Sequence, residues 1–225
     1  MHYACARGDL NIVKYMIEQL KADYSIKDKE GNNMFFTAVE HGHLELVKYF
    51  IEELKVSANS TKEGEINAIH IASNTNNVEI IEYLHSKGTD IEKVSIYGKP
   101  INWAVGSQNV QAAIKLLELG ASPEGDLTAS SPPPLILAID FNSEEIYQAL
   151  MKHKCSLEVM DPDGYTPLHL AAEKGELNIV KDLIEKGLDK YINKEVHGKT
   201  PLYLAFEKNQ WNVVSYLKDL THSAA

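Results

Sequence analysis

The chain has 225 residues, of which 44% are hydrophobic and 24% are charged, and its formal net charge is −10. These values are typical of a folded globular protein and exclude a disordered chain, and no apolar run is long enough to span a bilayer. The acidic charge and the lack of any cluster of lysine and arginine argue against sequence-independent binding of nucleic acid.

An alanine recurs at nearly equal spacing through the whole chain. The recurring residues are Ala4, Ala38, Ala72, Ala104, Ala138, Ala171 and Ala205, and the intervals between them are 34, 34, 32, 34, 33 and 34 residues. A fixed period of this length indicates an array of structural repeats. We call these residues the anchor alanines and count other positions in each repeat from them.

Each anchor alanine lies in a short predicted helix. In the sixth repeat, Thr166 followed by Pro167 is a helix-start signal, and Gly175 can end the helix because glycine tolerates a positive φ. The corresponding end positions in the other repeats are Gly8, Gly42, Asn76, Gln108, Asn142 and Asn209. Glycine and asparagine tolerate left-handed backbone, whereas Gln108 is a costly exception.

A second helix is predicted after each of these ends, because apolar residues follow at helical spacing. Examples are Ile12, Val13, Met16 and Ile17; Leu46, Val47, Phe50 and Ile51; Ile80, Ile81 and Leu84; and Ile179, Val180, Leu183 and Ile184. The small alanines let helices approach closely, and the longer aliphatic side chains fill the layer between repeats. No repeat can bury this surface alone, so the two ends of the array need polar caps.

Turns link successive repeats. At residues 28–31, 161–164 and 195–198 an acid stands three residues before a glycine, which is typical of a tight turn whose amides the acid can bind. Two connections depart from this pattern. One residue is lost at 98–100, and the consecutive prolines of 126–134 predict a distorted, extended connection.

The sixth repeat reads Asp-Gly-Tyr-Thr-Pro-Leu-His-Leu-Ala-Ala-Glu-Lys-Gly over residues 163–175, and this line resembles the ankyrin repeat. The resemblance covers nearly the whole chain. It implies an all-α ankyrin-repeat solenoid of stacked helix-turn-helix units with short hairpin-like connections, forming a single domain over residues 1–225. The implied repeats are 1–27, 28–60, 61–94, 95–127, 128–160, 161–194 and 195–225, and the first of them is incomplete.

Residues 98–106 and 209–221 are also similar to the ankyrin half of proteins that join an ankyrin array to tetratricopeptide repeats. That resemblance implies that a helical module could follow residue 225 in a longer protein. Met1 begins inside the first helix of a repeat, so we expect the chain to be a segment of such a protein. Cys5 and Cys155 lie in different repeats and should not meet, which predicts reduced thiols and a cytoplasmic location, with the nucleus not excluded.

No residue pattern predicts an active site. His41 and His43 flank Gly42, but no third or fourth metal ligand stands at a plausible spacing. His2, His70 and His169 share a position where the ankyrin pattern usually has a histidine that bonds to the backbone of a neighbouring loop. Asn59 starts a glycosylation acceptor triplet that a cytoplasmic chain would not use. We therefore expect no catalytic residue, no metal site and no cofactor.

The resemblance implies that a partner binds to the turn tips and to the exposed ends of the first helices. Most of these positions are polar, such as Asn32, but four apolar residues fall in three successive repeats and could line one patch typical of an interface hot spot. Together with charged neighbours, the candidate partner-binding residues are Ile96, Tyr97, Phe141, Tyr165, Asp140, Lys99, Glu173 and Lys174. The alternative is that Ile96 and Tyr97 only fill space beside the proline-rich connection.

The two tryptophans receive separate predictions. Trp103 is expected to turn toward the second helix and lie in the core, whereas Trp211 is expected to open the last second helix and to help close the end of the array.

Three functions remain open at this point. We predict a non-catalytic protein–protein interaction module that binds a protein or peptide on its concave face, as a monomer and without nucleic acid or membrane. The alternative is the ankyrin arm of a larger multidomain protein, such as a co-chaperone or targeting factor, whose activity lies outside this chain. An enzyme carried on the array would need perturbed titratable groups in a closed pocket, which a shallow groove rarely offers.

Overall fold

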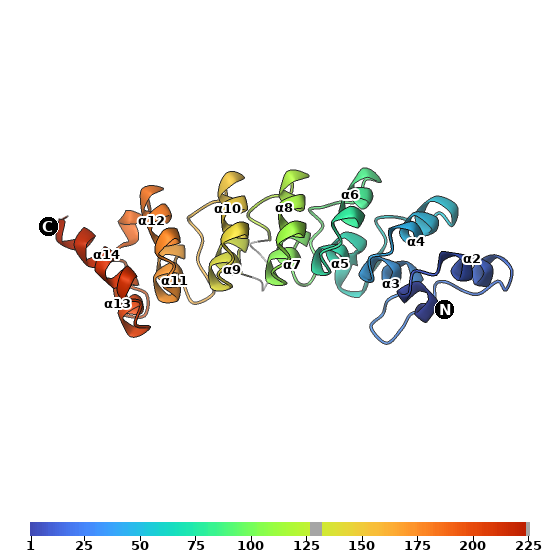
Figure 1. Cartoon of the computed structure of the whole chain (residues 1–225), viewed down its shortest axis with the longest axis horizontal. Helices are drawn as coiled ribbons and strands as arrows, with labels where there is room; N and C mark the ends of the chain where they lie inside the picture. Colours follow the sequence, from blue (N-terminus) through green and yellow to red (C-terminus); the bar gives the residue numbers. More distant parts are fainter. Residues whose placement is uncertain (127–131, 224–225) are drawn as a thin grey trace. The chain divides into compact units, whose positions relative to one another are not determined.

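The computed structural model describes residues 1–126 and 132–223, and the chain divides into two compact units, residues 1–130 and 131–225 (Figure 1). The first unit contains α1 (His2–Ala6), α2 (Leu10–Glu18), α3 (Met34–Glu40), α4 (Leu44–Lys48) with a π-helical extension (Tyr49–Glu53), α5 (Ala68–Asn74), α6 (Val78–Ser86), α7 (Pro100–Gly106) and α8 (Val110–Glu118). The second contains α9 (Pro134–Asp140), α10 (Glu144–Lys152), α11 (Pro167–Lys174), α12 (Leu177–Glu185), α13 (Pro201–Glu207) and α14 (Trp211–Ser223). The predicted all-α array of helix pairs is confirmed.

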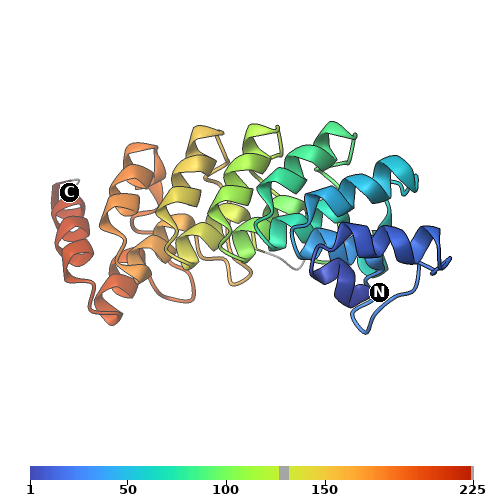
Figure 2. The same cartoon turned by 45° about the vertical axis from the view of Figure 1, so that its right-hand side comes forward.

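The helices of each unit form two layers (Figure 2). In the first unit α1, α3, α5 and α7 pack side by side, and the second helices of the repeats form the other layer. In the second unit α11 packs against both α9 and α13. The only strands of the described residues, β1 (Thr61–Lys62) and β2 (Ile66–Asn67), pair antiparallel around one turn.

The ends of the first helices adopt the predicted left-handed backbone. The φ values are 76° at Gly8, 77° at Gly42, 57° at Asn76, 57° at Gln108, 54° at Asn142, 82° at Gly175 and 60° at Asn209. At the exception, the Gln108 amide donates to Val105 and its carbonyl accepts from Val110, at 2.9 and 3.1 Å. Local hydrogen bonds thus offset part of the cost of a side chain in this conformation.

Two of the acid-containing turns are confirmed as predicted. One carboxylate oxygen of Asp28 accepts from the amides of Glu30 and Asn32, and one of Asp161 accepts from Asp163 and Tyr165, all within 3.0 Å. The turn at 195–198 is closed by two backbone hydrogen bonds across 196–199. The predicted distortion of the proline-rich connection falls on residues 127–131, outside the described part of the chain.

The core of each repeat is built on its anchor alanine. Six of the seven, all except Ala4 of the first repeat, have no exposed surface. The residues nine positions later are buried as well: Val13, Val47, Ile81, Ala113, Tyr147, Val180 and Val214. Because a methyl group is the largest side chain that these closely packed helices admit, the alanine sets the spacing between the layers.

A ladder of polar side chains also joins neighbouring repeats, and the sequence analysis missed it. The rungs stand five residues after the anchor alanine, and each donates to carbonyl oxygens at the end of the preceding first helix. The bonds are His43 to Ala6 at 2.8 Å, Asn77 to Val39 at 3.0 Å, Asn109 to Asn74 at 2.7 Å and Gln210 to Glu173 at 3.3 Å. These bonds satisfy carbonyls that a helix end leaves unpaired.

The ladder gives the helix-ending glycines a second role. A Cβ on Gly8 would lie 2.6 Å from the His43 ring, and one on Gly42 would lie 2.7 Å from the Asn77 amide oxygen. A side chain larger than hydrogen would displace the rung.

The ends of the chain differ from the prediction. Trp211 does begin α14, but its indole is 58% exposed and lies edge-on against Phe206, which is also exposed. The indole therefore does not close the end of the array, and the expected polar cap is replaced by apolar surface.

We predict that Ala171→Asp destabilises the protein by several kcal/mol, because it places a charge at a fully buried position between helices. Urea denaturation followed by circular dichroism measures the change. Asn178→Asp, which adds the same carboxylate on the exposed face of α12, is the matched control. Equal midpoints for Ala171→Asp and the wild type would contradict the register described above.

Glu176 holds the rung position in the sixth repeat, where a carboxylate cannot donate. Burial, followed by the nearby Glu144, raises the pKa of this carboxyl, so its ionised form destabilises the fold as pH rises above about 4.5. We predict that Glu176→Gln, which supplies a donor, stabilises the protein by about 1 kcal/mol at pH 7.5 and by less at pH 4. The reverse change, Gln210→Glu, should destabilise it, and thermal unfolding at both pH values tests the pair.

Candidate functional site

One turn of the first unit exposes several large apolar side chains. Val94, Ile96 and Tyr97 lie between α6 and α7 and are 43%, 58% and 62% exposed. The Ile96 amide donates to the Gly64 carbonyl of the neighbouring turn at 3.0 Å, and the Ile96 side chain covers Gly64 so closely that a Cβ there would lie 2.8 Å away. We call residues 94–98 the exposed turn.

The exposed turn is supported by a series of rings that leads into the core. The Tyr97 ring lies edge-on to Trp103 with centroids 5.6 Å apart, and Trp103 lies edge-on to His70 at 5.6 Å. The Trp103 indole donates to the Ser95 hydroxyl at 3.0 Å. The prediction that Trp103 belongs to the core was therefore wrong: it is half-buried, because its ring and its N–H both contact the exposed turn.

His70, at the buried end of this series, is held on three sides. Its Nε2 donates to the Gly98 carbonyl at 3.2 Å, and its Nδ1 and backbone amide bind Asn67 in a capping box at the start of α5. Burial lowers the pKa of His70 from 6.5 to about 4 despite these contacts. The imidazole is thus neutral near pH 7 and is part of the fold.

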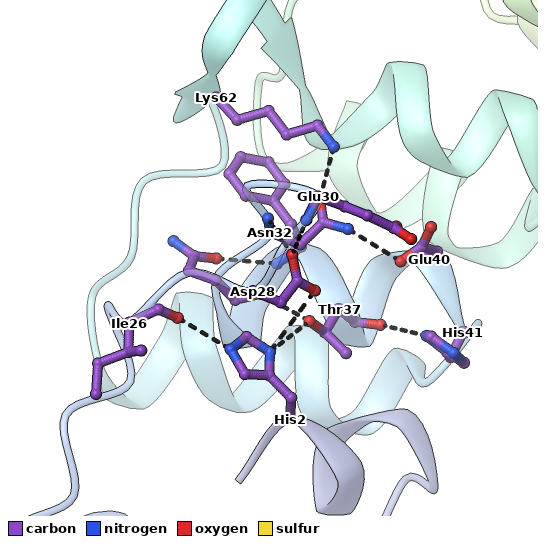
Figure 3. Close-up of polar contacts among 11 residues, drawn as sticks. His2, Ile26, Asp28, Glu30, Asn32, Thr37, Glu40, His41 and Lys62 are labelled. Carbon is purple, nitrogen blue, oxygen red and sulfur yellow. Dashed lines mark hydrogen bonds and ion pairs between the residues drawn. The ribbon is translucent and has the colours of Figure 1, made fainter.

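The other two histidines of this position also bind loop backbone, as predicted. His169 donates to the Lys194 carbonyl at 2.9 Å, and burial lowers its pKa. His2 donates to the Ile26 carbonyl at 3.1 Å, while its other ring nitrogen lies 3.1 Å from the Thr37 hydroxyl (Figure 3).

The first turn contains a polar cluster around Asn32, which Figure 3 shows beside α3. Asn32 donates to the Glu40 carboxylate at 3.1 Å and accepts from the Lys62 ammonium at 2.6 Å. It is only 1% exposed, so the prediction that it points outward at the tip was wrong. The reason is that its amide joins the turn to both α3 and β1.

The candidate residues of the second unit form a more polar surface. Phe141 is 37% exposed, and the adjacent Asp140 pairs with Lys174 at 2.7 Å. Tyr165 is half-buried, because its ring packs against His169 and His197 with centroids 5.7 and 5.9 Å away.

The remaining charged candidates are also paired. Glu173 pairs with Lys208 at 3.3 Å in the second unit, and Lys99 pairs with Glu92 at 2.7 Å in the first. The structure thus brings Ile96, Tyr97 and Lys99 together in one unit and Asp140, Phe141 and Lys174 together in the other.

Other polar candidates have structural roles. The Asn59 side chain donates to the Gly88 carbonyl at 3.1 Å and accepts from the Asp90 amide at 3.0 Å, so a glycan on this nitrogen would break an inter-repeat contact. Cys5 is fully buried, and burial raises the pKa of its thiol to about 11. In the described residues no group of three or more histidine, cysteine, aspartate or glutamate side chains could hold a metal ion. No helix there is long and apolar enough to cross a membrane.

The repeating geometry agrees with a known family model. A model described as ankyrin repeats in three copies matches residues 1–95, 101–194 and 135–224. The chain belongs to the ankyrin-repeat family. Among solved structures, the ankyrin repeat domain of Bcl-3 matches with a TM-score of 0.74 and 23% identity over 95% of this chain and 96% of that one. The human ASB11 ankyrin repeat domain matches with a TM-score of 0.76 and 20% identity over 91% and 90%. Both likenesses concern the fold.

Curated ankyrin-repeat relatives are much longer proteins. The chain is 30% identical over 208 residues to the palmitoyltransferase AKR1 of Lachancea kluyveri, which covers 88% of this chain and 28% of that protein. It is 31% identical over 115 residues to alpha-latrocrustotoxin-Lt1a of Latrodectus tredecimguttatus, over 50% of this chain and 8% of the toxin. The ankyrin array of this chain thus corresponds to a minor part of each.

We predict that stability falls as the pH drops from about 6.5 toward 4, because the unfolded chain binds protons at histidines that the fold keeps neutral. The pKa of His70 alone accounts for up to about 3 kcal/mol at pH 4. Urea denaturation at several pH values measures the slope. His70→Gln should lower stability at pH 7 and flatten the slope, and an unchanged slope would show that His70 does not titrate in this range.

Proposed function

We propose that the chain is a non-catalytic binding array that holds a protein or peptide partner on the surface of its turns and first helices. The exposed turn is the principal contact in the first unit. The observation that supports this most is an exposed aliphatic and aromatic pair, Ile96 and Tyr97, on backbone already fixed by hydrogen bonds and stacked rings. A fixed apolar surface loses little entropy when a partner covers it.

The packing of Ile96 also bears on the alternative that these residues only fill space. Ile96 does cover Gly64, as that alternative requires. More than half of its surface and of the Tyr97 surface nevertheless remains exposed, which packing alone does not explain. Phe141 with the Asp140–Lys174 pair forms a second, smaller contact in the other unit.

Charge narrows the class of partner. The chain carries a net charge of −10, and the exposed turns include Glu30 and Glu63. An acidic field favours association with a segment that carries basic residues, and a rim charge beside an apolar contact adds orientation. The proposed partner is therefore a protein segment with an apolar or aromatic residue next to lysine or arginine.

A second candidate function is the ankyrin arm of a larger multidomain protein whose activity lies outside this chain. The lengths of the relatives favour it, since this chain spans 28% of the palmitoyltransferase and 8% of the toxin. The likeness to proteins with tetratricopeptide repeats, and a cytoplasmic location, stay predictions of the same kind. Sequencing the full transcript beyond both ends tests this candidate directly.

We predict that Tyr97→Ala weakens partner binding about tenfold or more, and that Phe141→Ala weakens it less, with little change in stability because both rings are partly exposed. Affinity capture from a lysate of the source cells, followed by mass spectrometry, compares each variant with the wild type.

Tyr15→Ala is the control for this experiment, because Tyr15 is a similarly exposed ring on α2, in the layer of second helices. A protein captured by wild type and Tyr15→Ala but lost by Tyr97→Ala supports the proposed site. Equal capture by all three forms would place the site elsewhere.

A further inference from the structure

The last helix pair, α13 and α14, leaves large apolar side chains uncovered. Tyr203, Phe206 and Trp211 are 49%, 55% and 58% exposed, and we call them the C-terminal face. Phe206 directly follows an anchor alanine, a position that is otherwise completely buried. Its counterparts with no exposed surface include Cys5, Val39, Ser73, Ile139 and Ala172. Tyr203 likewise stands at the position where His70 and His169 are fully buried.

The first helix pair, α1 and α2, has the reverse pattern. Tyr3, Ile12 and Tyr15 are 74%, 51% and 57% exposed, and we call them the N-terminal face. Tyr3 directly precedes an anchor alanine, and Ile12 stands eight residues after it. The counterparts of these two residues are at most 7% exposed and include Thr37, Ile71, Leu170 and Leu204, and Leu46, Ile80, Ile179 and Val213.

Each face thus exposes the positions that a neighbouring repeat covers elsewhere. The positions of the C-terminal face are covered in repeats that have a following neighbour, and those of the N-terminal face are covered in repeats that have a preceding one. Inside each unit these two sets of positions meet at every junction between repeats. The two end faces are therefore complementary to each other by register, as well as apolar.

We propose that the C-terminal face of one copy of this chain binds the N-terminal face of another, so that copies associate head to tail. Such a contact is heterologous, because it uses different surfaces on the two molecules and leaves one face free at each end. The monomer expected from the sequence is replaced by a concentration-dependent chain of copies.

A polar contact of the internal junctions supports the same pairing. The Tyr49 hydroxyl donates to Glu18 at 3.1 Å, and the Tyr83 hydroxyl donates to Glu52 at 3.0 Å. In each case the tyrosine stands eleven residues after its anchor alanine, and the acid stands fourteen after the preceding one. The same register places Tyr15 of one copy opposite Asp219 of the next, which again joins a phenol to a carboxylate.

One position weakens the contact between copies and supplies a test of its geometry. Asp9 occupies the rung position of the first repeat, where His43 and Asn77 donate to the carbonyls of the preceding helix. A carboxylate at this position faces carbonyl oxygens and cannot donate to them. Asp9→Asn should therefore tighten association about fivefold, as one added hydrogen bond would.

Sedimentation velocity over a range of concentrations tests the proposal. The wild-type chain should show an average mass that rises with concentration. Phe206→Lys blocks the C-terminal face and Ile12→Lys blocks the N-terminal face, and each variant alone should remain a monomer. Both substitutions are at exposed positions, so the fold should persist, which circular dichroism checks. Met160→Lys, an exposed position outside both faces, should associate like the wild type.

The mixture of the two blocked variants decides the mode of binding. Each variant keeps one intact face, so an equimolar mixture should form a one-to-one complex that does not grow further. A wild-type chain that stays monomeric at all concentrations would overturn the proposal. Dimers of Ile12→Lys alone, or a mixture that shows no complex, would also overturn it, because they would indicate a symmetric contact or none.

Discussion

Close stacking of one repeat on the next, set by the buried anchor alanines, is the constraint on which the rest of the structure depends. A helix pair of this size has too little apolar surface to fold alone, and the neighbouring pair supplies the other half of its core. The positions beside the alanine, such as Val39 and Ile139, are fully buried only because a neighbour covers them. Local stability in this chain is therefore a property of junctions more than of single repeats.

Polar groups complete each junction at defined places. Histidines at one position bind the backbone of the following turn, and the rungs of the side-chain ladder bind the end of the preceding helix. These bonds remove the unpaired carbonyls that such short helices leave in large number. The same arrangement fixes the turns from below, so that residues at the turn tips are free to differ. The exposed turn with Ile96 and Tyr97 is an example of that freedom.

The fold followed from the sequence because period, helix ends and apolar spacing all agree. Even Gln108, an unfavourable residue for left-handed backbone, adopts it. The details of the turns did not follow, because they depend on contacts between residues far apart in the chain. Asn32 is buried by Lys62, and Trp103 is drawn out of the core by Ser95 and Tyr97. The ladder had a signal in the recurrence of His43, Asn77, Asn109 and Gln210, but a loose polar pattern is hard to separate from ordinary surface.

The two kinds of contact between second helices and their neighbours have different consequences for change in this chain. A rung such as Asn77 binds main-chain oxygens, which any repeat offers whatever its side chains are. The pair of Tyr49 and Glu18 needs a matched residue on both sides. Duplication or loss of a whole repeat would therefore preserve the rungs while breaking the tyrosine–glutamate pairs. Arrays of this kind can change length in evolution at junctions held mainly by the backbone.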